Sequence, residues 1–136
     1  MSKAQSDAVK ARIQTYPLVA TKTFKSIVDH GTLPPYVVIH GAPGTDTQER
    51  FTGGRTTSNP RYTLHLVGVD ADQVEVMTDR LKAKFIANGL GIPLSVPGET
   101  CRSLWWSAPV PIQVSTDPLP QMAWQVVELG WTAEPA

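Results

Sequence analysis

The feature that most constrains the fold is an alternating segment that leads directly into an amphipathic one. In residues 61 to 69, RYTLHLVGV, apolar and more polar side chains alternate, as they do on a β-strand with one buried face. Tyr62, Leu64 and Leu66 belong to that face. Two valines near the end make the strand apolar on its other side as well, which predicts a central strand covered on both sides.

The amphipathic segment that follows is predicted to be a helix over residues 71 to 88. Asp70 is a good N-cap residue, and Gln73 three positions later completes a capping-box pattern. Asn88 and Gly89 favour the left-handed backbone that ends a helix. The apolar side chains at helical spacing are Val74, Met77, Leu81 and Phe85.

The rest of the chain predicts an α+β fold around this strand and helix. Residues 4 to 16 suit a short helix that Pro17 stops. TKTFKSIVDHG, residues 21 to 31, and the β-branched residues 36 to 40 are predicted as two strands. Three more strands are expected in the last third, in CRSLWWSA, VPIQV and MAWQVVELGW. We therefore expect a single domain with two helices packed on a mainly antiparallel sheet.

The last third is also rich in proline. Residues 93 to 120 hold six of the 12 prolines. Because proline cannot donate a hydrogen bond to a neighbouring strand, strands in this segment should be short and lie at sheet edges.

The segment VVIHGAPGTDT raises the question of nucleotide binding. A phosphate-binding loop needs Gly-Lys where this chain has Asp46-Thr47, and the carboxylate of Asp46 would repel phosphate. The motif also needs a helix directly afterwards, and the sequence that follows has no helical pattern. No nucleotide site is expected here.

Residues 41 to 59 are instead predicted to form one long loop. Loops of this length are usually functional or disordered. Arg50, Phe51 and Arg55 are residue types that anchor interfaces, and glycines and threonines surround them. We expect them at a contact surface that orders on binding; the alternative is a surface loop with no role.

A fourth interface candidate is Trp105. Neighbouring residues on a strand point to opposite faces, so Trp105 and Trp106 cannot both enter one core layer. By alternation Trp105 shares its face with Cys101, Ser103 and Ser107, which suggests that it points outward and can anchor a partner. The alternative is that a helix covers that face and both tryptophans are core.

Composition and motifs argue against several functions. The net charge is zero, with eight Lys/Arg and four Asp/Glu in residues 1 to 61 and four and eight in residues 62 to 136. This asymmetry suits head-to-tail contact, although chance explains it as well, and no basic cluster suggests nucleic acid. The three histidines show no metal-ligand spacing and no catalytic signature surrounds the single cysteine, so no enzyme, cofactor or metal is expected. No secretory signal and no transmembrane run is present, which predicts a soluble cytosolic product.

The order of these elements resembles the tail terminator, or tail completion, proteins of long-tailed phages. The resemblance rests on a short N-terminal helix, the segment LPPYVVI, a long polar loop with Gly53-Gly54, and a strand that ends in VGVD before an amphipathic helix. It covers roughly residues 5 to 90, and the proline-rich C-terminal third fits it only loosely.

The resemblance implies a single tail-terminator-like domain over residues 1 to 136, without a cofactor. Proteins of this family form a six-fold ring that caps the tail tube at its final length and offers the surface for joining the head. The implied partners are five further copies of the chain, the major tail tube protein and a head-completion or neck protein. DNA would only pass through the ring. The implied location is the head-proximal end of the virion tail, after assembly in the host cytoplasm.

Three alternatives remain open at this point. A head-completion or neck protein has a similar size and architecture. A small-molecule enzyme and a monomeric binding module are the candidates from other classes.

Overall fold

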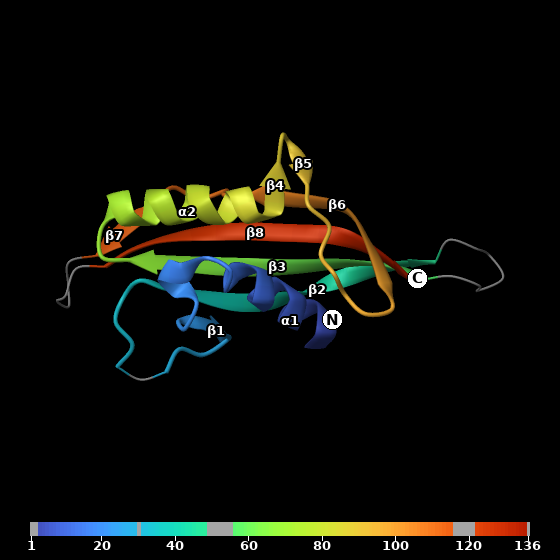
Figure 1. Cartoon of the computed structure of the whole chain (residues 1–136), viewed down its shortest axis with the longest axis horizontal. Helices are drawn as coiled ribbons and strands as arrows, with labels where there is room; N and C mark the ends of the chain where they lie inside the picture. Colours follow the sequence, from blue (N-terminus) through green and yellow to red (C-terminus); the bar gives the residue numbers. More distant parts are fainter. Residues whose placement is uncertain (1–2, 30, 49–55, 116–121, 136) are drawn as a thin grey trace.

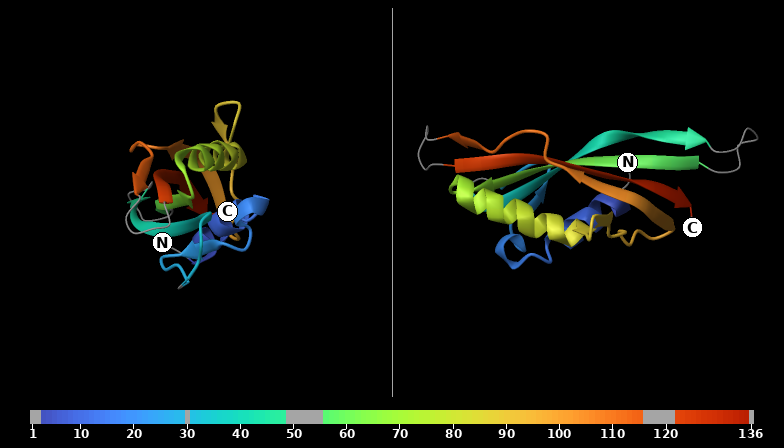
Figure 2. Two further views of the ribbon diagram at one scale, coloured as in Figure 1. Left: turned by 90° about the vertical axis from the view of Figure 1, so that its left-hand side faces the viewer. Right: turned by 90° about the horizontal axis from the view of Figure 1, so that it is seen from above.

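A computed structural model of the chain describes residues 3–29, 31–48, 56–115 and 122–135. It confirms an α+β fold with two helices and a mainly antiparallel sheet. The helices are α1 (Lys3–Ile13) and α2 (Ala71–Phe85), and a short 3-10 helix, η1 (Pro17–Val19), follows α1. Figures 1 and 2 show both helices on the same side of a long, twisted sheet.

The main sheet has the strand order β1-β2-β3-β8-β6, and β7 also pairs with β8. Among the described strands, β1 and β2 alone pair in parallel. A separate hairpin, β4-β5, follows α2. The strands are β1 (Thr23–Lys25), β2 (Tyr36–Gln48), β3 (Thr56–Gly68), β4 (Ile86–Ala87), β5 (Leu90–Gly91), β6 (Glu99–Ser107), β7 (Gln113–Ser115) and β8 (Met122–Pro135).

The core lies between the sheet and the two helices. Tyr62, Leu64 and Leu66 are buried on the helix side of β3, as the alternation predicts. From α2 the core receives the four predicted residues Val74, Met77, Leu81 and Phe85, all fully buried. From β2 and β8 it receives Val37, Ile39, Val127, Leu129 and Trp131.

The start of α2 confirms Asp70 as the N-cap, and the reciprocal bond of the predicted capping box is made one residue earlier, to Val69 instead of Asp70. The Asp70 carboxylate accepts a hydrogen bond from the Gln73 backbone N–H, at 2.8 Å. In return, the Gln73 side-chain oxygen accepts one from the Val69 N–H at 2.8 Å. These bonds satisfy N–H groups that have no partner inside the helix.

The helix ends earlier than predicted. It stops at Phe85, and Asn88 and Gly89, with φ values of 52° and 77°, turn the tight β4-β5 hairpin. Asn-Gly is the preferred pair for a two-residue hairpin turn, because both positions need a positive φ. The strand predicted over residues 21 to 31 is also shorter, since Ser26 has a φ of 66° and β1 ends at Lys25.

The expectation of a long loop over residues 41 to 59 is wrong for the part that the structure describes. β2 continues to Gln48 and β3 begins at Thr56, so most of this segment is an antiparallel hairpin that extends from one end of the sheet (Figure 1). The register shifts between Ala42 and Thr45, so that two residues face one across the ladder. Such a bulge accommodates the Pro43 and Gly44 that suggested a loop.

The prediction that β3 is covered on both sides is also wrong in part. The strand is central, but both helices lie on one face of the sheet (Figure 2). On the other face Val67 is buried and Val69, just beyond the strand, is 45% exposed. Val67 is in register with Tyr36 and Trp124, and these large neighbours shield it without a helix.

Candidate functional site

The face of the sheet opposite the helices is the first candidate contact surface, and we call it the open face. It presents the alternate residues of β2, β3, β8 and β6, whose side chains are only partly buried for the most part. Three cross-strand rows can be followed in the register. They are Val38, His65 and Val126; Thr63, Glu128 and Ser107; and Arg61, Gly130 and Trp105.

Trp105 lies outward on the open face, as predicted. Its side chain is 37% exposed, whereas Trp106 contacts the core and lies 5.5 Å from the Phe85 ring centroid. The Arg61 guanidinium lies over the Trp105 ring, 5.7 Å from its centroid. A cation over an aromatic ring contributes about 0.5–1 kcal/mol at exposed sites.

Gly130 allows the Trp105 indole to lie flat on the sheet. A Cβ on Gly130 would come within 2.8 Å of the Trp105 ring and 2.9 Å of the Pro60 carbonyl oxygen. Both distances are too short for real contacts, so a side chain here must displace the indole or the backbone. The sequence thus builds a platform for an exposed tryptophan.

The prediction that Cys101 lies on the same face of the strand as Trp105 is wrong. A register shift between Arg102 and Trp105, with Ser103 at a φ of 55°, inserts an extra residue in β6. Cys101 and Leu104 are therefore both buried in the core. Alternation fails across a bulge, and nothing in the single sequence marks this one.

His40 and His65 come together on the open face, with ring centroids 4.9 Å apart. Burial lowers the pKa of His65, and the adjacent His40 lowers it further. His65 is thereby disfavoured from carrying a proton near neutral pH. In the described part of the chain, no group of three or more His, Cys, Asp and Glu side chains is placed to hold a metal ion.

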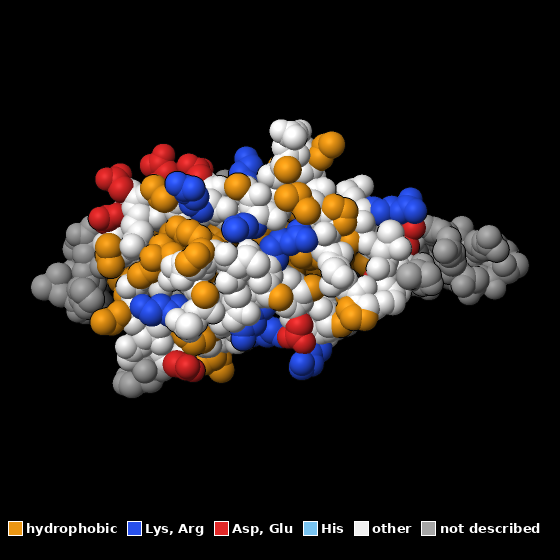
Figure 3. Space-filling view, viewed as in Figure 1, with side chains coloured by type: hydrophobic (Ala, Val, Ile, Leu, Met, Phe, Trp, Pro, Cys, Tyr) orange, Lys and Arg blue, Asp and Glu red, His pale blue; other side chains and the backbone are white. Residues whose placement is uncertain are grey.

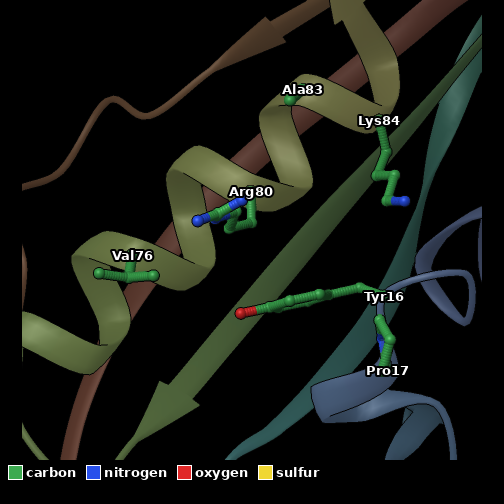
Figure 4. A pocket seen from close by; sticks show the side chains of 6 residues that line it. All are labelled: Tyr16, Pro17, Val76, Arg80, Ala83 and Lys84. Atoms are coloured by element: carbon green, nitrogen blue, oxygen red, sulfur yellow. The ribbon is translucent and has the colours of Figure 1, made fainter.

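The second candidate surface is an open groove between α2 and the turn that joins α1 to η1. It has a volume of about 580 Å³. Figure 4 shows the Tyr16 ring and Pro17 on one wall, facing α2 across the groove. The α2 wall is formed by Val76, Arg80, Ala83 and Lys84. Two cations, a phenol and exposed aliphatic groups are suited to an anionic, partly apolar partner.

The sequence does not point to this groove, because it arises from the packing of two distant segments. The signal that could have found its α2 wall is the pair Arg80 and Lys84, which lie four residues apart on one helix face. Of the predicted interface residues, only Trp105 can be placed. Arg50, Phe51 and Arg55 lie outside the described residues.

The single cysteine, Cys101, is a poor nucleophile in this structure. Burial raises the pKa of the Cys101 thiol, which lowers its thiolate fraction and its nucleophilicity.

No helix in the described residues has the length and apolar character to span a membrane.

The comparisons with known proteins give a fold. No family model and no curated protein matches the chain. Among solved structures, a chain in the virion of a native gene transfer agent particle superposes with a TM-score of 0.62 and 13% identity. The match covers 98% of this chain and 99% of that one. A second solved protein, which carries no functional name, matches with a TM-score of 0.52 and 16% identity, over 100% and 96% of the two chains.

Proposed function

We propose that this protein is a structural component of a phage or phage-like virion, and specifically a tail terminator. The observation that carries the proposal is the end-to-end fold match to a chain in a gene transfer agent virion. The match covers nearly the full length of both chains, so the two proteins share one complete fold, which supports a structural role in such a particle. The order of elements in the sequence supports the finer assignment.

In this proposal six copies form a ring that caps the tail tube and ends its polymerisation. The ring also offers a surface to a head-completion or neck protein, and DNA passes through its lumen. The protein works without a cofactor and without chemistry, at the head-proximal end of the tail. The features that suit this role are the projecting β2-β3 hairpin, the open face and the groove.

Electron microscopy of the purified protein, together with its native mass, tests the ring. Rings of about six copies are expected, either in the free protein or after addition of tail tubes. A protein that stays monomeric under both conditions and does not bind tubes contradicts the proposal.

A tube-growth assay tests the terminator role. The purified major tail protein is polymerised with and without this protein, and tube lengths are measured. Shorter tubes with a ring at one end support a terminator. Rings that bind to heads but leave tube growth unchanged would replace the terminator by a head-completion protein.

A further inference from the structure

The groove beside α2 is lined by two cationic side chains that have no ion-pair partner among the described residues. Arg80 and Lys84 both line it, and neither forms an ion pair with any residue in the described ranges. Two like charges four residues apart on a helix repel each other slightly. An external anionic group between Arg80 and Lys84 would therefore relieve this repulsion.

A stripe of acidic side chains lies along another side of the same helix. Asp72, Glu75 and Asp79 are exposed, and none pairs with a described cation. Figure 3 shows acidic side chains gathered at the outer edge of the N-terminal half of α2, with basic side chains beside them on the viewed face. We call this set the acidic stripe.

We infer that the groove of one copy receives the acidic stripe of the next copy in the ring. The inference rests on the proposed ring-forming function and identifies the contact that would build it. Glu75 and Asp79 are spaced four residues apart, as are Arg80 and Lys84, so each pair spans roughly 6 Å along its own helix. The two pairs thus match in charge and in spacing.

Apolar atoms make the groove a protein contact surface and not only a charged one. Val76 is 52% exposed on the α2 wall, and Leu18, which follows the groove residue Pro17, is 42% exposed. Aliphatic side chains that are shielded beside a charge pair keep water away and strengthen the attraction. A small inorganic anion would leave these groups uncovered, whereas the side of a neighbouring helix covers them.

The angle between the two surfaces suits a closed ring. At about 100° per residue, the acidic stripe and the groove-lining side of α2 lie roughly 90–140° apart around the helix axis. When one surface is pressed against the other, each copy is rotated by roughly 40–90°. The helix axes must also tilt away from the ring axis, because Glu75 and Asp79 precede Arg80 and Lys84 by five residues, about 7.5 Å along the helix. Such a contact closes after about four to nine copies, a range that includes six, whereas surfaces on opposite sides of the helix would give a filament.

Charge reversal tests this contact. One variant carries Glu75→Lys with Asp79→Lys, and the other carries Arg80→Glu with Lys84→Glu. Each variant alone places like charges across the contact, so we expect ring formation to need at least about tenfold more protein. A 1:1 mixture restores opposite charges at every contact, and rings should return near the wild-type concentration. Sedimentation velocity at low salt measures both, with and without tail tubes.

The matched control is Lys10→Glu, which reverses a charge on α1 that belongs neither to the groove nor to the acidic stripe. It should leave the ring unaffected, and thermal melting should show that all variants fold. If both charge-reversed variants still form rings at the wild-type concentration, the inference is overturned and the proposed function stands. A mixture that fails to recover, or a wild-type protein that stops at a dimer, also overturns the inference. A wild-type protein that neither forms rings nor binds tubes contradicts the proposed function itself.

Discussion

On β3, Leu64 and Leu66 are fully buried beneath the helices, whereas His65 between them is only partly buried on the open face. The same contrast separates Trp106 from Trp105 on β6. One side of each strand is thus matched to α1 and α2, and the other keeps aromatic, imidazole and charged groups near the surface. Side chains on the helix side should therefore determine stability, while those on the open face should determine contacts with other chains.

The largest effect should come from the helix side. Leu81→Ala removes a fully buried side chain from α2 and leaves a cavity, so the free energy of unfolding should fall by about 2–5 kcal/mol. Chemical denaturation measures the loss. The control is Val76→Ala on the exposed side of the same helix, which should change stability by less than about 1 kcal/mol. Equal losses from the two variants would contradict the assignment of the core.

Because of Tyr62, the free energy of unfolding should depend on pH in the alkaline range. Burial, with smaller contributions from the nearby charges of Glu99 and Asp7, raises the pKa of its phenol from 10.0 to about 12. The phenol of the unfolded chain loses its proton at a lower pH than the phenol of the folded chain. The free energy of unfolding is therefore unaffected below pH 10 and decreases as the pH rises toward 12. The loss should reach about 2–3 kcal/mol.

Tyr62→Phe isolates this contribution. No described group hydrogen-bonds the Tyr62 hydroxyl, so the substitution should be nearly neutral at pH 7. Above pH 10 the variant should lose less stability than the parent, in denaturation series at fixed pH. Identical pH profiles for the two proteins would show that the phenol is not protected from ionisation.

Gly130→Ala probes the platform beneath Trp105. The new methyl group would meet the indole and the Pro60 carbonyl, so stability should fall by about 1–3 kcal/mol. The double variant with Trp105→Ala should recover part of this loss, because one of the two clashes is removed. A double-mutant cycle with strictly additive effects would rule out that contact.

The smallest effect on stability should come from Trp105 itself. Trp105→Ala removes an indole that is partly exposed and contacts Arg61, so the cost should be about 1 kcal/mol or less. Assembly should suffer more, and native mass at several protein concentrations measures it. Trp106→Ala is the matched control. It removes a contact with the Phe85 ring and should therefore lower the free energy of unfolding more than Trp105→Ala does. If both variants destabilise the chain equally, the open face is part of the core.

Much of the fold could be predicted because the signals for α2 and for the buried face of β3 are local. The N-cap at Asp70 and the spacing of Val74, Met77 and Leu81 depend only on neighbours in the sequence. The length of the β2-β3 hairpin could not be predicted in this way. Its ladder pairs Thr45 with Asn59 across a bulge, and this long-range pairing outweighs the turn preference of Gly-Pro-rich residues.

The candidate contact surfaces were harder to predict than the fold. The outward direction of Trp105 could be predicted because it shares a strand face with Ser107 on the near side of the bulge, although the same alternation fails for Cys101 beyond it. The groove could not be predicted, because Tyr16 and Lys84 are brought together only when the turn after α1 packs beside α2. The open face exists because, in the described structure, no helix covers that side of the sheet. Alternation within one strand does not reveal which of its two sides is covered.

The position of β8 has a consequence for biosynthesis. Residues Met122–Pro135 form the last strand along the chain, yet they lie between β3 and β6 in the sheet. During translation, β3 and α2 leave the ribosome well before the strand that completes their layer. Until this segment emerges, one edge of β3 is open to pairing with other chains, and the central layer of the sheet can close only after β8 has been made.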